Sequence, residues 1–213
     1  MNSQAVWTEK ELGKVIVRAE KAATKKRWQR AIKYGTRAVE GSLALDHKEA
    51  PRYINLLKNL NVYYDKTGKL ADIPEQVEST YNQSFKVLGN DHPTTLKSRT
   101  LLFKLLLIQK RFSAAIPLVL EDIAINEKDP KGQYKILVYL SQLYSLYALT
   151  GQFEREGETL ERLLALNIRL FGDKDASHLP IIKDLSNNYC RRKQQEKFTQ
   201  LVEKYDLKFQ CKL

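Results

Sequence analysis

The sequence predicts an all-α fold, a right-handed superhelical solenoid of about five antiparallel helix pairs. Apolar residues recur every three or four positions in stretches such as 96–110 and 156–172, which is the spacing of one helix face. No stretch alternates apolar and polar residues for long, and no Asn-Gly or Asp-Gly pair marks a β-hairpin. Turn sequences also divide the chain at a nearly constant interval, and this third observation sets the architecture.

The turns share one register along the chain. Their reference residues are spaced by 42, 42, 41 and 42 positions and are Lys26, Gly68, Lys110, Gly151 and Lys193. Four positions before them stand Ala22, Tyr64, Leu106, Tyr147 and Tyr189. Two positions after them stand Trp28, Leu70, Phe112, Phe153 and Gln195. Two antiparallel helices need an aromatic residue near the turn to fill the gap between them. A small or apolar residue one turn later, such as Ala31, Ile73 or Ala115, lets the helices approach.

These turns define the expected domain organisation. Residues 1–8 form a short extension, and 9–213 form one solenoid with repeats at roughly 9–45, 46–89, 90–129, 130–172 and 173–213. One helix pair cannot bury its apolar face alone, so successive pairs stack. We expect the first helix of each pair to line an inner, concave wall and the second helix to form the outer wall.

Three segments, 59–73, 101–115 and 142–156, resemble the tetratricopeptide repeat (TPR). The spacing and the segment "LGNDHPTTL" (88–96) are similar to the longer repeat variant of kinesin light chains, and 170–180 and, more weakly, 43–51 resemble the same segment. Eight positions before the reference residues stand Arg18, Leu60, Leu102, Leu143 and Leu185. The first repeat lacks the apolar residue at Arg18 and the aromatic at Ala22, and the fifth has Gln195 where an aromatic is expected. The resemblance implies that the chain has no reaction of its own and binds a protein or peptide in the concave groove.

Helical phase predicts which side chains line that groove. The candidates are Asn55, Lys58, Asn59, Lys97, Thr100, Lys104, Ser141, Gln142, Lys183, Asn187 and Arg191, together with Val62, Asp65, Leu101, Ser145 and Asp184. Amides can pair with a peptide backbone, and lysine or arginine favours carboxylate or phosphate. The set indicates a groove for an acidic or carboxylate-ended peptide. The alternative is an ordinary solvated helix face.

A basic run at the first turn is a second candidate site. Its residues are Lys25, Lys26, Arg27, Arg30, Lys33 and Arg37, with Trp28 among them. Basic residues interleaved with an aromatic can bind nucleic acid. Trp28 also occupies the structural position beside the turn, however, so we expect it to be buried, and a solvated basic helix is the preferred interpretation of the run.

Other features narrow the function classes. The formal net charge is +11 and the pI is about 9.5, which favours nucleic acid, an anionic membrane or an acidic protein as partner. The sequence shows no catalytic motif and no metal-ligand spacing among His47, His92 and His178. We therefore expect no enzyme, no cofactor and no metal. Glu154, Glu156 and Glu158 are interpreted as a solvated helix face.

The remaining expectations concern location and assembly. The N-terminus lacks the pattern of a secretory signal and no apolar run is long enough to span a membrane, so an intracellular, cytoplasmic location is expected. Cys190 and Cys211 are interpreted as two separate packing thiols in a reducing compartment. An alternative function is a structural subunit of a larger complex, with interfaces formed by Tyr53, Tyr63, Tyr81 and Tyr134.

The segment 88–96 is expected to separate two helices. Gly89 is suited to stop a helix in a left-handed conformation. Asp91 or His92 can cap the next helix, and Pro93 fits its first turn, where the missing N–H costs nothing.

Overall fold

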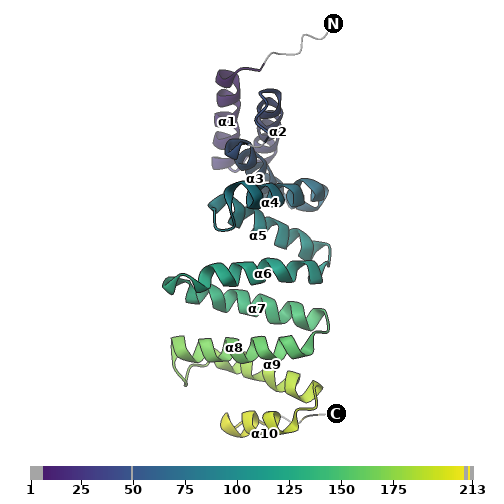
Figure 1. Ribbon diagram of the computed structural model, residues 1–213, viewed down its shortest axis with the longest axis vertical. Coiled ribbons are helices and arrows are strands. Elements are labelled where there is room, and N and C mark those ends of the chain that lie inside the picture. The colour runs from purple at the N-terminus through teal and green to yellow at the C-terminus, as the bar shows by residue number, and fades with distance from the viewer. Residues whose placement is uncertain (1–6, 49, 209–210, 212–213) are drawn as a thin grey trace. The chain divides into compact units, whose positions relative to one another are not determined.

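A computed structural model describes residues 7–48, 50–208 and 211. Within these ranges the chain forms ten α-helices, two short 3₁₀-helices and no strand, which confirms the all-α prediction (Figure 1). The helices are α1 (Glu9–Thr24), α2 (Trp28–Ala44), α3 (Pro51–Lys66), α4 (Pro74–Leu88), α5 (Pro93–Ile108), α6 (Phe112–Glu127), α7 (Gln133–Leu149), α8 (Phe153–Phe171), α9 (His178–Arg191) and α10 (Gln195–Lys204), with η1 (Leu70–Asp72) and η2 (Pro130–Gly132).

The chain divides into two compact halves, residues 1–110 and residues 111–213. In the N-terminal half, α1 packs on α2, α2 on α3, α3 on α4 and α4 on α5, and α3 also packs directly on α5. In the C-terminal half, α6, α7, α8, α9 and α10 pack in chain order. This sequential packing is that of a helical repeat. The expectation of one solenoid over 9–213 stays a prediction.

Each half has a core made by the apolar helix faces. In the N-terminal half, Leu12, Val15 and Ala38 form one buried cluster and Ala19, Ala31 and Leu60 belong to another. In the C-terminal half, the buried side chains include Leu140, Leu143, Leu160, Leu163, Ile182 and Leu185. Complete burial of one such leucine or isoleucine contributes about 1.5–3 kcal/mol.

All five reference residues of the predicted turns have a positive φ. The angles are 53° for Lys26, 72° for Gly68, 57° for Lys110, 71° for Gly151 and 56° for Lys193. At four of the turns the next N–H donates a hydrogen bond to the carbonyl five residues earlier: Arg27 to Ala22 (2.8 Å), Lys69 to Tyr64 (3.0 Å), Gln152 to Tyr147 (2.9 Å) and Gln194 to Tyr189 (2.9 Å). This bond ends the first helix of a pair with a left-handed residue.

The second repeat has a longer turn than the others. Leu70 is buried, but it begins the short helix η1, and α4 starts only at Pro74. Proline disfavours a helical conformation in the residue before it, and Ile73 accordingly has φ −131° and ψ 47°. Ile73 was expected inside the second helix of this pair and instead precedes it.

The segment 88–96 separates α4 from α5. Gly89 ends α4 with φ 90° and ψ 168°, a conformation that favours glycine. His92 is the capping residue, because its Nδ1 accepts a hydrogen bond from the N–H of Thr94 at 3.1 Å. Pro93 is the first residue of α5, as predicted.

The two cysteines form a disulfide, so the interpretation of Cys190 and Cys211 as separate thiols is wrong. Their Cα atoms are 5.6 Å apart, within the usual disulfide range. Cys190 lies near the end of α9, and Cys211 lies beyond α10. Cys211 therefore lies beside the last turn of α9, which the spacing of the cysteines alone does not reveal.

Three tyrosines proposed as interface residues are core residues instead. Tyr53, Tyr63 and Tyr81 are each 7% exposed, whereas Tyr134 is 60% exposed. Tyrosine is amphipathic, and its ring is used here to fill the space between neighbouring helices. Only Tyr134 of this set remains available for an intermolecular contact.

We expect Gly68→Ala to lower the free energy of unfolding by about 1 kcal/mol, because the left-handed region penalises a Cβ. A Cβ at Gly68 meets no atom within 4 Å, so the backbone conformation is the sole cause. Lys26→Gly, at the same turn position, should raise it by about 0.5–1 kcal/mol. Urea unfolding followed by circular dichroism measures both changes.

Gly13→Ala is the matched control for Gly68→Ala. Gly13 lies inside α1 and also has no atom within 4 Å of an added Cβ. The substitution should stabilise by about 0.5–1 kcal/mol, because alanine favours a helix more than glycine. The same change in both variants would contradict a left-handed requirement at residue 68.

Reduction of the Cys190–Cys211 bond should lower the free energy of unfolding of residues 111–213 by about 3 kcal/mol, because the bond closes a loop over a sequence separation of 21 residues. Denaturation with and without reductant measures the loss, and Cys190→Ser/Cys211→Ser should be insensitive to reductant. Alkylation of two thiols in the unreduced protein would contradict the disulfide.

Candidate functional site

The candidate site in the N-terminal half is formed by α3 and α5, which lie side by side. We call it the α3–α5 face and define it by Asn55, Lys58, Asn59, Asp65, Lys97, Thr100 and Lys104. On α5 these residues are three and four positions apart, and on α3 Asn55 is three and four positions from Lys58 and Asn59, so they share one side of each helix. Three cross-helix pairs, each 39 residues apart, fix the register: Asn55 with Thr94, Lys58 with Lys97, and Asp65 with Lys104.

Lys58 is the electrostatically perturbed residue of the α3–α5 face. It is half-buried, and its Nζ donates a hydrogen bond to Oδ1 of Asn59 at 2.6 Å. Loss of hydration, and then the positive charge of Lys97, lower the pKa of Lys58. Within the described ranges no carboxylate forms an ion pair with Lys58 or with Lys97. The face therefore holds two neighbouring cations without a counter-charge.

The lowered pKa of Lys58 also has a consequence for stability. On raising the pH, the folded protein releases this proton before the unfolded chain does. The contribution of Lys58 to the free energy of unfolding therefore rises with pH between the lowered pKa and the ordinary lysine value. At neutral pH the charged ammonium is a cost that an anionic ligand would reduce.

The other predicted residues of this face differ in availability. Asn55, Lys97, Thr100 and Lys104 are exposed, and Asn59 is half-buried. Lys104 pairs with Asp65, and the hydroxyl of Thr100 donates to the carbonyl of Leu96 on its own helix at 2.9 Å. Leu101 was predicted on the same face, but it is 1% exposed and belongs to the core.

In the C-terminal half, the predicted residues lie on α7 and α9. Ser141, Lys183 and Asn187 are exposed and Gln142 is half-buried. The hydroxyl of Ser141 donates to the carbonyl of Leu137 at 2.9 Å, so it is already used within α7. Lys183 and Asn187 are the residues of this set that the structure leaves available.

Arg191 is committed to a contact between α9 and α8. Its guanidinium lies 4.5 Å from the centre of the Phe153 ring and 3.3 Å from a carboxylate oxygen of Glu156. Glu156 is only 5% exposed, so the interpretation of Glu154, Glu156 and Glu158 as a solvated face is wrong at this position. Glu154 and Glu158 are exposed. A buried carboxylate requires such a partner.

The predicted basic run lies on α1, α2 and the turn between them. All six of its members are exposed: Lys25, Lys26, Arg27, Arg30, Lys33 and Arg37. Trp28 is half-buried and packs against the core, as its place beside the turn predicted.

Three of the six residues of the basic run line a small cleft, which the sequence did not predict. The cleft has a volume of about 210 Å³ and is lined by Arg18, Lys21, Ala22, Lys25, Arg27, Arg30 and Tyr34.

A larger cleft of about 710 Å³ lies in the C-terminal half, between the end of α6, η2, the start of α7, and α8. Its two arginines already have partners. Arg162 pairs with Glu127, and Arg169 donates to Oε1 of Gln133 at 3.2 Å. Both arginines of this cleft are therefore already bonded to other residues that line it.

The described residues offer no metal centre and no membrane span. They contain no group of three or more His, Cys, Asp or Glu side chains that could hold a metal ion. His178 is 2% exposed, and its Nε2 lies 2.6 Å from the carbonyl oxygen of Gly172. No helix in the described ranges is both long and apolar enough to cross a membrane.

Comparison with known proteins identifies the fold. No protein-family model and no curated protein matches the sequence. A crystal structure from Podosopora anserina, described as kinesin light chain with nearly identical TPR-like repeats, is 21% identical with a TM-score of 0.63, covering 91% of this chain and 92% of that chain. A point variant of that protein gives 21% identity, a TM-score of 0.62 and the same coverage.

A third solved structure, BtubC (BKLC) from P. vanneervenii, is 17% identical with a TM-score of 0.58 and covers 91% of this chain and 77% of that chain. The chain thus has the TPR-like helical repeat fold of kinesin-light-chain repeat proteins, which confirms the resemblance. At these identities the likeness concerns the fold alone.

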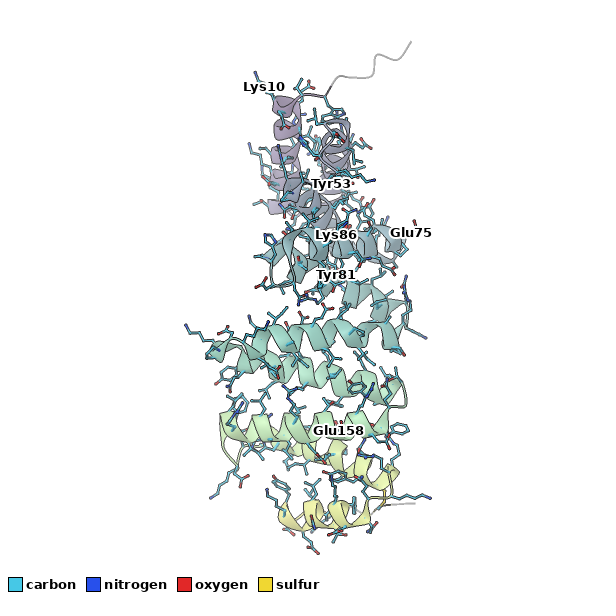
Figure 2. All side chains as sticks on the ribbon, in the orientation of Figure 1. Lys10, Tyr53, Glu75, Tyr81, Lys86 and Glu158 are labelled. Atoms are coloured by element: carbon cyan, nitrogen blue, oxygen red, sulfur yellow. A yellow bond between two sulfur atoms is a disulfide. The ribbon has the colours of Figure 1, made fainter. Side chains whose placement is uncertain are left out.

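We expect Lys97→Gln to raise the pKa of Lys58, because it removes the neighbouring positive charge. Titration of the lysine side chains by NMR measures the change. Lys86→Gln is the control, since Lys86 is an exposed lysine on α4 (Figure 2). An unchanged pKa of Lys58 in Lys97→Gln would contradict the coupling across α3 and α5.

Proposed function

We propose that this chain is a non-enzymatic protein-interaction module, an adaptor that binds a partner peptide bearing acidic groups. TPR-like repeats typically bind other proteins, and the fold supports this general role. The observation that carries the specific proposal is the pair Lys58 and Lys97, which lacks a carboxylate within the described part of the chain. A peptide carboxylate would supply the missing counter-charge.

The contacts of the α3–α5 face suggest how such a peptide is held. Asn55 and Asn59 can pair with the N–H and C=O groups of an extended peptide. Lys58 loses part of its hydration in the free protein, so a charge-assisted hydrogen bond to a carboxylate costs little further desolvation. Lys104 is already paired with Asp65, so the part of the α3–α5 face that is available to a peptide ends before this ion pair.

The same surface gives the reason for an acidic partner. The chain carries 36 Lys and Arg against 25 Asp and Glu. Long-range attraction would raise the rate at which an acidic segment meets this surface. The Lys58–Lys97 pair then selects carboxylates at short range.

The intracellular location is also a proposal. It rests on the sequence expectation alone. The Cys190–Cys211 disulfide, by contrast, argues against the strongly reducing compartment that the sequence also suggested. The mass of the alkylated protein isolated without reductant from its native cell would decide between free thiols and a disulfide.

Short acidic peptides, with free and amidated C-termini, test the proposal by fluorescence polarisation. Lys58→Ala/Lys97→Ala should weaken binding at least about tenfold, since charge-assisted hydrogen bonds contribute roughly 1.5–3 kcal/mol each. Binding should also tighten as salt is lowered. The amidated peptides show whether the recognised carboxylate is the chain end.

The matched control changes two lysines away from the α3–α5 face. Lys86→Ala/Lys69→Ala alters the net charge by the same amount, and both residues are exposed. This variant should bind within about threefold of the native chain, because charges separated by more than a Debye length are screened. Equal loss in both variants, or no binding of any acidic peptide, would refute the proposed site.

A further inference from the structure

We propose that the cleft between α1 and α2 is a binding site for a small anion with several phosphate groups. The cleft is lined by five cationic side chains, Arg18, Lys21, Lys25, Arg27 and Arg30, together with Ala22 and Tyr34. No acidic residue is part of the lining. The proposal is independent of the peptide site on α3 and α5.

The cleft exists because the first repeat departs from the pattern of the others. The position of Arg18 is filled by Leu60, Leu102, Leu143 and Leu185 in the later repeats, and all four are buried. The position of Ala22 is filled by Tyr64, Leu106, Tyr147 and Tyr189. An exposed arginine replaces a core leucine, and a methyl group replaces a large side chain. The first repeat therefore has an open, basic hollow beside its turn.

The cations in this hollow are not neutralised by the protein. In the described ranges, none of the five forms an ion pair with a carboxylate. Elsewhere the chain does pair its cations: Arg52 with Glu9, Arg162 with Glu127 and Lys197 with Glu161. Unpaired cations also occur elsewhere, as at Lys58 and Lys97, but at α1 and α2 five of them line a single cleft.

The start of α2 strengthens the preference for an anion. The N-terminus of a helix carries a partial positive charge, which disfavours nearby cations. Arg27 nevertheless precedes α2, Arg30 lies in its first turn, and no acidic residue stands there. The second helices α4, α8 and α10 have acidic residues in that turn. A bound anion would offset both the side-chain charges and the helix dipole.

The size and aromatic content of the cleft favour small phosphates over nucleic acid. A volume of about 210 Å³ is below the roughly 300–1,000 Å³ of sites for larger organic ligands. Binding of single-stranded nucleic acid relies on aromatic rings that stack with bases. Trp28 and Tyr34 are half-buried and packed against the core, so neither ring is free to stack.

Calorimetric titration with tripolyphosphate at near-physiological salt tests the site. The native chain should bind, and Arg18→Glu/Arg30→Glu should weaken the affinity at least about tenfold. Lys21→Gln/Lys25→Gln is a milder second variant that should weaken it in the same direction. Lys10→Glu/Lys86→Glu is the matched control, because it changes two exposed cations, on α1 and α4, that neither line the cleft nor lie three or four residues from its arginines. Circular dichroism verifies that each variant is folded.

The control should retain affinity within about threefold, since its charges lie outside the cleft. Absence of tripolyphosphate binding by the native chain would overturn the proposal. Equal losses in the cleft variant and the control would also overturn it, because they would indicate diffuse attraction. A single-stranded oligonucleotide that binds more tightly than tripolyphosphate and loses affinity in Arg18→Glu/Arg30→Glu would replace the small anion with nucleic acid.

Discussion

The hydrogen bond that closes the helix pairs at four of the turns is the constraint on which the rest of the structure depends. It joins the N–H after a left-handed residue to a carbonyl five positions earlier, as between Gln152 and Tyr147. This bond ends the first helix at a defined residue and reverses the chain toward the second helix. The turn therefore decides which side chains of both helices enter the core and which remain on the surface.

The turns could be predicted from the sequence because their cause is local. Glycine at positions 68 and 151 and the fixed 42-residue register indicate a left-handed residue without any knowledge of tertiary packing. Local sequence also predicted a cap at Asp91 or His92 and a helix start at Pro93, and the structure has His92 as the cap and Pro93 as the first residue of α5. Even the three lysines that adopt a positive φ follow from the register, although lysine itself gives no such signal.

Features that depend on tertiary contacts could not be predicted in this way. One residue corresponds to 100° around a helix, so a small error in phase separates exposed Thr100 from buried Leu101. The burial of Glu156 depends on Arg191 of the next helix, and the disulfide depends on the return of the chain after α10. The departures from the repeat pattern at Arg18 and Ala22 were the sequence signal for the cleft at α1 and α2. In the sequence they indicated only an atypical end repeat.

The candidate sites follow from where positive charge is left unbalanced. In the C-terminal half, Arg162, Arg191 and Lys197 are each paired with a glutamate and stabilise contacts between helices. In the N-terminal half, Lys58 and Lys97 share one face, and the cations of the first turn share one cleft. Two anionic ligands of different chemistry, a peptide carboxylate and a small polyphosphate, are thus proposed for two separate surfaces of one fold.

The most direct test of the central claim, that a partner binds on the first helices α3 and α5, is an NMR titration of the isotope-labelled chain with an acidic peptide. We expect the largest backbone and side-chain shifts to cluster at Asn55, Lys58, Asn59 and Lys97. The side-chain amides of Asn55 and Asn59 should report the same peptide affinity as the lysine Nζ groups. Shifts confined to α2 and α4, or spread evenly over all exposed lysines, would contradict the claim.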